Sequence, residues 1–128
     1  MTDDPIRLDV SDGAARIVLN RPDKYNALND ALVARLSDAL ETVERDPDVR
    51  CVVVSGAGDA FCTGGDIDRM RRRRDREVTP PQMRREVIFQ VRDTVEHLFS
   101  LEKPVIVKVD GFAMGAGANL ALAGDLVF

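Results

Sequence analysis

The sequence predicts an α/β fold in which strands alternate with helices. Two mainly apolar runs, residues 51–54 and 105–109, are typical of strands buried inside a sheet. Helical periodicity follows Asn29 and recurs in the residues before 105, so helices separate the strand candidates. Strands joined through helices pair in parallel by crossover connections, which places the chain in the α/β class.

The individual elements are justified in chain order. Residues 6–10 and 15–19 alternate apolar and polar side chains around a Ser-Asp-Gly turn, which predicts a β-hairpin. Asn29 caps a predicted helix that ends before Pro47, and a strand at residues 50–55 leads into a loop that ends near Asp66. A second helix is predicted from an apolar face that contains Val87, Ile88, Val91, Val95, Leu98 and Phe99.

The C-terminal quarter adds three expectations. Residues 105–109 form a buried strand, and the Gly/Ala-rich stretch that follows it ends in a helix near residue 123. Residues 125–128 open a further buried strand. Because the apolar run is unfinished, we expect residues 1–128 to be part of a longer fold.

Composition limits the classes of function. The 128 residues carry a net charge of -4, with 45% hydrophobic and 31% charged side chains, as in an ordinary globular domain. This acidity argues against non-specific DNA binding. With no apolar run of about 18 residues and no leader pattern, we expect a cytoplasmic protein without a membrane partner. Cys51 and Cys62 are expected to be free thiols, with no metal site.

Several common catalytic and nucleotide-binding motifs are absent or incomplete in this sequence. The single histidine, His97, is expected to be a partly exposed helix residue, which disfavours a histidine-based nucleophilic mechanism. Gly56 and Gly58 begin a dinucleotide-binding pattern, but Phe61 occupies the place of the third glycine. The chain also lacks a P-loop motif.

Two glycine-containing turns follow buried strands, where open α/β sheets place their ligands. The first spans residues 60–67 and holds Gly64 and Gly65; the second spans residues 111–119 and exposes backbone amides at the start of a helix. If both turns face one pocket, one amide from each would form an oxyanion hole for a carbonyl that becomes an enolate. The alternative is that the glycines only permit tight loop packing.

Three blocks of sequence resemble the enoyl-CoA hydratase/isomerase (crotonase) family. They are residues 19–29 (LNRPDKYNALN), 60–67 (AFCTGGDI) and 103–125. The resemblance implies a spiral of ββα units, of which residues 1–128 are the N-terminal portion, usually assembled as homotrimers or homohexamers. It also implies an acyl-CoA substrate in fatty acid metabolism, with no cofactor beyond the coenzyme A of the substrate.

The resemblance also assigns roles to individual residues. The amides of Gly65 and Ala116 would hold the thioester oxygen. Coenzyme A would lie along Lys24, Ala27 and Leu28, with its adenine near Asp66 and Ile67. Asp66 is also expected to cap the following helix.

Asn119 stands where hydratases (lyases) of the family have a glutamate, one of two that handle a water molecule. An amide orients a water or substrate but cannot exchange a proton near neutral pH. We therefore expect double-bond isomerisation, which isomerases of the family perform with one carboxylate, rather than hydration. Residues 115–122 also resemble the ring-opening epoxyphenylacetyl-CoA isomerases. In those relatives the working carboxylate lies after the position of Phe128, so this chain alone is expected to be inactive.

Six arginines lie between residues 69 and 76, and they are expected on a solvated helical face or a mobile loop. The alternatives are attraction of the coenzyme A phosphates or binding of RNA. A further alternative is an acyl-CoA-binding or assembly subunit without catalysis. If the oxyanion-hole amides already donate hydrogen bonds within the fold, this non-catalytic role would be favoured over an enzyme.

Overall fold

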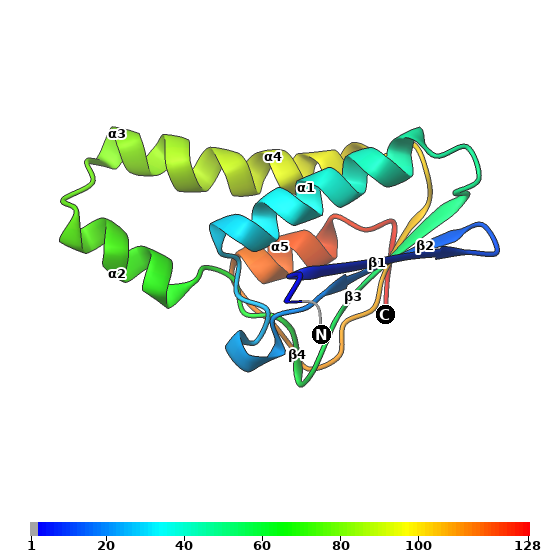
Figure 1. Ribbon diagram of the computed structural model, residues 1–128, viewed down its shortest axis with the longest axis horizontal. Coiled ribbons are helices and arrows are strands. Elements are labelled where there is room, and N and C mark those ends of the chain that lie inside the picture. The colour runs from blue at the N-terminus through cyan, green and yellow to red at the C-terminus, as the bar shows by residue number, and fades with distance from the viewer. Residues whose placement is uncertain (1–2) are drawn as a thin grey trace.

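The computed structural model describes residues 3–128, apart from the side chain of Val87, as a sheet with helices packed on one face (Figure 1). The predicted hairpin is confirmed: β1 (Ile6–Ser11) pairs antiparallel with β2 (Ala14–Leu19). Asp12 and Gly13 turn the chain with φ angles of 52° and 79°. Two successive left-handed residues are what a tight hairpin turn requires.

The remaining strands of the main sheet are parallel. β3 (Cys51–Gly56), β5 (Val105–Val107) and β7 (Leu126–Val127) extend it in the order β1-β2-β3-β5-β7. The predicted α/β class is therefore confirmed. Expected burial was partly wrong: Val52 and Val54 are fully buried, whereas Val53 is only half-buried, because the helices cover one face.

The last predicted strand also needs correction. Residues 126–127 do form β7, but Leu126 is 55% and Val127 is 45% exposed, so the strand is not buried. β7 is an edge strand whose described partner is β5 alone, which explains why its side chains stay open. Asp125, just before it, accepts a hydrogen bond from the Val105 amide at 2.8 Å and ties the two strand starts together.

Helix α1 (Asp30–Arg45) covers the sheet with the apolar face that the sequence predicts. Asn29 caps it by accepting a hydrogen bond from the Leu32 amide at 2.9 Å, as expected. At its other end, the Lys103 ammonium donates to the carbonyl oxygens of Val43 and Asp46, each at 2.6 Å. These bonds give partners to two carbonyl oxygens at the end of the helix, where intrahelical donors are lacking.

The second predicted helix extends beyond the residues whose apolar periodicity predicted it. It runs without a break through α3 (Pro80–Met83), a π-helical turn η2 (Arg84–Ile88) and α4 (Phe89–Ser100). Leu98 is buried against the core, but Ile88 is 51% and Phe99 is 74% exposed. The side chain of Val87 lies outside the described part. One side of the apolar face packs against α1, and the other faces a cavity.

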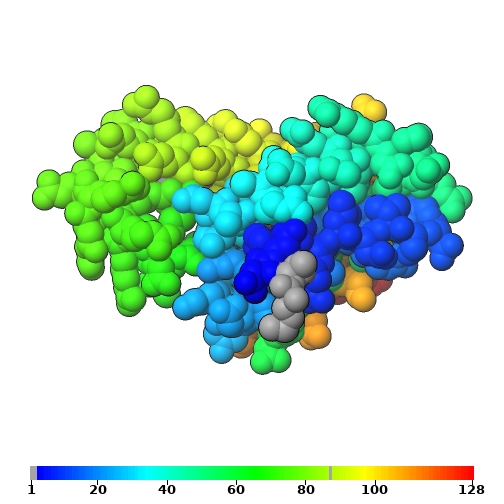
Figure 2. Space-filling view, viewed as in Figure 1, coloured from blue at the N-terminus to red at the C-terminus, as the bar shows by residue number. Residues whose placement is uncertain are grey.

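The predicted loop after β3 contains a strand that sequence reasoning missed. β4 (Ala60–Cys62) pairs in parallel with β6 (Phe112–Ala113) in a separate two-stranded sheet. β4 leads to α2 (Ile67–Asp75), and β6 leads to α5 (Ala116–Leu122); the short helix η1 (Pro22–Lys24) precedes α1. Figure 2 shows α2 and α3, in green, projecting beyond the rest of the molecule.

Candidate functional site

The short sheet brings the two glycine-containing turns together. Ala60 pairs with Phe112 and Cys62 with Ala113, and the Met114 amide donates to the Cys62 carbonyl oxygen at 3.0 Å. A Cβ atom placed on Gly64 would lie 3.3 Å from the Ala116 nitrogen. The two turns are thus in direct contact.

Two glycines make this contact possible. Gly64 has φ +92°, a backbone conformation that residues with a side chain rarely adopt, and a Cβ atom there would lie 2.8 Å from the Met114 carbonyl oxygen. A Cβ on Gly117 would overlap the Cys62 carbonyl oxygen, so only glycine lets α5 approach β4 this closely. Tight packing of the glycines and a ligand site at the turns therefore do not exclude each other, since the packing holds the two turns side by side.

The amides of Gly65 and Ala116 remain available. Among the hydrogen bonds of residues 3–128, neither nitrogen donates to a protein acceptor. Their neighbours are engaged: the Gly64 carbonyl accepts from the Leu28 amide at 2.7 Å, and the Gly117 amide donates to Met114 at 2.8 Å. The result that would have favoured a non-catalytic protein, amides already bonded within the fold, is not found in this part of the chain.

Both amides belong to residues that line a cavity of about 610 Å³ between α2, α4 and α5. Asn119 lines it from α5, and its exposed side chain lies one helical turn beyond Ala116. Most of the wall is apolar. The full lining is Leu28, Gly65, Asp66, Arg69, Met70, Arg73, Ile88, Val91, Arg92, Val95, Glu96, Phe99, Ala116, Asn119, Leu122 and Ala123.

Met70 lies over one of the two amide-bearing residues. Its side chain is 54% exposed, and its terminal methyl group would meet a Cβ placed on Gly65 at 2.5 Å. Methionine has three rotatable bonds and no strong hydrogen-bonding group, so it covers this turn without occupying the amide. Met70 therefore fills the side of Gly65 on which a side chain would stand.

Asp66 is the helix cap that the sequence predicts. Its carboxylate accepts from the Arg69 amide at 2.8 Å and from the Arg21 guanidinium at 3.0 Å. Burial alone would raise the pKa of Asp66, but the hydrogen bonds from Arg69 and Arg21 and the charge of Arg21 together lower it below its ordinary value. A carboxylate held in its charged form by two donors is a poor proton acceptor.

Arg21 and Asn26 support the site, although the sequence alone assigned them no chemistry. Asn26 is fully buried and donates to the carbonyl oxygens of Ala57 and Ala60 at 2.9 and 2.8 Å, while its own side-chain oxygen accepts from the Arg21 amide at 2.8 Å. The segment before α1 is thereby fixed to β4. The only signal in the sequence was the Asx and proline content of residues 20–26, which indicates a turn.

The residues expected along coenzyme A are divided. Leu28 and Asp66 line the cavity beside Gly65, whereas Lys24, Ala27 and Ile67 lie outside its lining. The Lys24 ammonium is 3.9 Å from the Asp68 carboxylate, Ala27 is buried, and Ile67 is 64% exposed. Their proposed contacts to coenzyme A therefore stay predictions.

The expectation for the arginine run is wrong at two positions. Arg69 and Arg73 are each only 4% exposed, because they point from α2 towards Asp30 of α1 and Glu86 of the π-turn. Three others have nearby acidic partners: Arg71 with Asp68, Arg74 with Asp75 and Arg76 with Glu86, at 3.7, 3.1 and 3.8 Å. The run is a helix with a buried polar edge.

A further carboxylate on the cavity wall was missed by sequence reasoning. Glu96 lies on α4, its side chain is 68% exposed, and it pairs with Arg92 at 3.7 Å. His97, the next residue, is turned away to Glu44, with 3.0 Å between Nε2 and Oε2. Within residues 3–128, no group of three histidine, cysteine or acidic side chains is arranged to hold a metal ion.

With this geometry established, comparison with known proteins is decisive. The family model described as enoyl-CoA hydratase/isomerase matches residues 9–128. The chain belongs to the enoyl-CoA hydratase/isomerase family. The match includes both turns and all of α5, so the resemblance seen in the three sequence blocks is confirmed at the level of the family.

Curated relatives include both hydratases and isomerases. The chain is 42% identical over 122 residues to a 1,2-epoxyphenylacetyl-CoA isomerase of Escherichia coli, covering 92% of this chain and 44% of the relative. It is 41% identical over 123 residues to a probable enoyl-CoA hydratase of Mycobacterium tuberculosis, covering 96% and 46%. The chain thus spans less than half the length of these relatives.

Solved structures show the same fold. A crystal structure of an enoyl-CoA hydratase/isomerase from Xanthobacter autotrophicus matches with a TM-score of 0.88 and 32% identity, over 98% of this chain and 46% of the other. A crotonase-fold protein from Legionella pneumophila matches with a TM-score of 0.89 at 24% identity, which bears on the fold alone. The predicted crotonase fold is therefore confirmed.

Proposed function

We propose that the protein carrying this chain isomerises the double bond of an acyl-CoA thioester through an enolate. The observation that carries the proposal is the pair of amides at Gly65 and Ala116, both without a protein acceptor and both on residues of one cavity. Two such donors stabilise the negative charge that develops on the thioester oxygen when a proton leaves the neighbouring carbon. The apolar wall formed by α4 and α5 suits the acyl group.

Asn119 supports isomerisation over hydration. Its amide lies on the cavity wall, where it can donate to or accept from a substrate or a water molecule, but it cannot take up a proton. Hydration by two carboxylates needs a base at this place, whereas a double-bond shift needs one group that removes a proton at one carbon and returns it at another. We place that base after residue 128, following the resemblance to the ring-opening isomerases.

RNA binding gains no support from the arginine run. Five of its six members are within 4.0 Å of an acidic side chain, and two of these are buried. Such pairing leaves little unbalanced charge for a phosphate backbone. In residues 3–128 no helix is both long and apolar enough to cross a bilayer. Expected residence in the cytoplasm stays a prediction.

Product analysis tests the proposal directly. The protein carrying this chain is incubated separately with a 3-enoyl-CoA and with a 2-enoyl-CoA of the same length, and the products are separated by chromatography. We expect interconversion of the two enoyl thioesters with little 3-hydroxyacyl-CoA. Formation of 3-hydroxyacyl-CoA as the main product from the 2-enoyl thioester would overturn the preference for isomerisation, and no turnover of either substrate would overturn the enzymatic function.

A further inference from the structure

The peptide group between Gly64 and Gly65 fixes the direction of one proposed oxyanion donor. Its carbonyl oxygen, on Gly64, accepts from the Leu28 amide at 2.7 Å, while its N–H belongs to Gly65. This peptide bond is trans, so its C=O and N–H point in opposite directions. The Gly65 N–H is therefore directed away from Leu28, in agreement with the burial of Gly64 and the exposure of Gly65.

The peptide group between Ala27 and Leu28 is fixed in the same way. Its N–H makes the bond just described, and its carbonyl oxygen, on Ala27, accepts from Nη1 of Arg21 at 2.5 Å and from the Asn29 amide at 3.1 Å. A continuous series of hydrogen bonds thus leads from the Arg21 guanidinium through two peptide groups to the Gly65 N–H. Hydrogen bonds in such a series polarise one another, and burial strengthens them.

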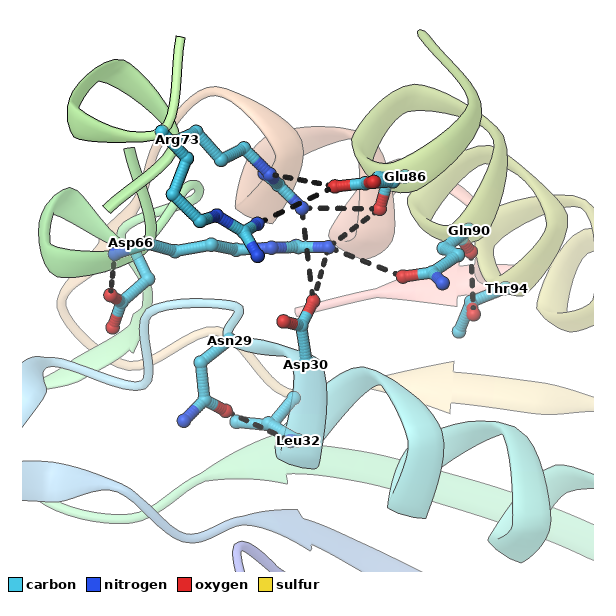
Figure 3. A network of polar contacts seen from close by, with 10 residues as sticks. Asn29, Asp30, Leu32, Asp66, Arg73, Glu86, Gln90 and Thr94 are labelled. Atoms are coloured by element: carbon cyan, nitrogen blue, oxygen red, sulfur yellow. Dashed lines mark hydrogen bonds and ion pairs between the residues drawn. The ribbon is translucent and has the colours of Figure 1, made fainter. Parts of the chain in front are cut away.

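The cation at the start of this series is held in place. Its side chain is 17% exposed, and Nη1 also donates at 3.0 Å to the carboxylate of Asp66, which caps α2 (Figure 3). The Arg21 backbone is fixed by Asn26, whose amide donates to the Arg21 carbonyl oxygen at 2.9 Å and whose side-chain oxygen accepts from the Arg21 amide at 2.8 Å. The guanidinium therefore contacts both segments that the Leu28–Gly64 bond joins.

Arg21 also balances a neighbouring charge. Asp66 directly follows Gly65, its side chain is only 5% exposed, and its lowered pKa keeps it ionised at neutral pH. A buried anion without a partner at this place would oppose the negative charge that develops on the thioester oxygen. This effect is separate from polarisation of the amide, so a test has to distinguish the two.

We propose that Arg21 is a positioning residue of the oxyanion hole, which orients and polarises the Gly65 N–H through these two peptide groups. The inference rests on the proposed function, since it assumes that the thioester oxygen binds at Gly65 and Ala116. The Ala116 amide begins α5 and lies outside the series. Arg21 therefore acts on one of the two donors, and its influence should be felt mainly when charge develops on the oxygen.

The test combines kinetics with infrared spectroscopy on the protein that carries this chain. The product assay with a 3-enoyl-CoA gives kcat and KM. Butanoyl-CoA, isotope-labelled at the thioester carbon, is the spectroscopic probe, because it is saturated and has no double bond to shift. A stronger donor weakens the C=O bond and lowers its stretching frequency, so the band of the bound probe reports on the oxyanion hole rather than on folding.

The variants separate the two effects of Arg21. Arg21→Met removes the donor and the charge, and Arg21→Lys restores a cation. Asp66→Asn is made alone and together with Arg21→Met, so these two proteins lack the anion and differ only at position 21. Arg35→Met is the matched control, because it breaks a comparable pair with Asp4, 2.9 Å apart, that lies outside the cavity lining.

We expect Arg21→Met to lower kcat about 10- to 100-fold, less than the complete loss of one oxyanion donor, with KM within about threefold of the parent. The double variant should show a similar fall in kcat relative to Asp66→Asn alone. In both comparisons the band of the bound probe should move to higher frequency. Arg21→Lys should recover most of the loss, and Arg35→Met should keep kcat within about threefold of the parent.

Three outcomes would contradict these expectations. Equal kcat in the double variant and in Asp66→Asn would show that Arg21 only balances the anion, which would overturn its role in positioning. A fall in kcat without a change in the band would indicate a general structural effect, with the same consequence. Absence of both turnover and probe binding in the parent would instead overturn the proposed function. Because the double variant buries no unpaired anion, its comparison remains decisive if Arg21→Met fails to fold.

Discussion

At the scale of single residues, the proposed oxyanion hole depends on backbone atoms rather than on side chains. Ala116 occupies a place where only its N–H is needed, and it is the first residue of α5. Proline is tolerated at this helical position but has no N–H. The chain therefore offers a substitution that removes a single donor.

We predict that Ala116→Pro lowers kcat for enoyl-CoA isomerisation about 100- to 1,000-fold, the cost of losing one oxyanion donor. The matched control, Ala116→Ser, retains the amide and should keep turnover within about threefold of the parent. Both are measured in the product assay, with circular dichroism to verify folding. Equal activity of the proline and serine variants would show that this amide is not used.

Asn119 supports a second prediction about chemistry. Asn119→Glu places a carboxylate on the cavity wall, where it can act on a water molecule. In the protein carrying this chain we expect the ratio of 3-hydroxyacyl-CoA to isomerised product to rise by about tenfold or more, provided that a second carboxylate is present. Asn119→Gln, which lengthens the side chain without adding a proton acceptor, is the control. An unchanged ratio in the glutamate variant would count against the role given to this position.

Asp66 predicts how stability depends on pH. Its folded pKa lies below the ordinary value of 3.8, so its stabilising contribution is present above that value and is lost as the pH falls through the folded pKa. Between about pH 5 and pH 2, urea unfolding should show a smaller loss of stability in Asp66→Asn than in the parent. The dependence does not vanish, because the pKa of Asp4 is also lowered, chiefly by its hydrogen bonds from Arg35 and Ile6. Equal losses in both proteins would contradict the assignment.

At the scale of elements, the contact of β4 with α5 sets the distance between the two turns. A Cβ on Gly117 would overlap the Cys62 carbonyl oxygen. Gly117→Ala should therefore push α5 away, lower isomerase turnover at least tenfold and destabilise the fold by about 1–3 kcal/mol. Ala118→Gly, at the next helical position, should cost about 1 kcal/mol and leave turnover largely unchanged. Parallel losses in both variants would show that general helix stability, not turn alignment, controls activity.

Elements defined by local signals were predictable from the sequence. The hairpin turn, the Asn29 cap and the Asp66 cap follow from neighbouring residues, and each is found as expected. β4 and β6 were not predicted, because strands of three and two residues carry too little periodicity. Burial of Arg69 and Arg73 depends on Asp30 and on a π-turn at residues 84–88, which are distant in sequence and carry no local signal.

At the scale of the whole molecule, the predicted site is assembled from distant segments. Leu28, Gly65 and Asp66 precede or begin α2, while Ala116 and Asn119 lie on α5, and all five line one cavity. The sequence alone could assign the two amides to one pocket only conditionally, since their contact depends on the β4–β6 pairing. This chain spans less than half the length of the curated relatives that it matches. The expected trimeric or hexameric assembly, the identity of the base and whatever covers the exposed apolar wall are therefore questions about the whole protein.

The most direct measurement is a crystal structure of the protein carrying this chain with a bound acetoacetyl-CoA. We predict that the thioester oxygen lies within about 3.1 Å of both the Gly65 and the Ala116 nitrogen, the distance expected for an oxyanion hole. The acyl group should extend along α4. A thioester oxygen that contacts neither amide, or a ligand bound outside the cavity, would contradict the account.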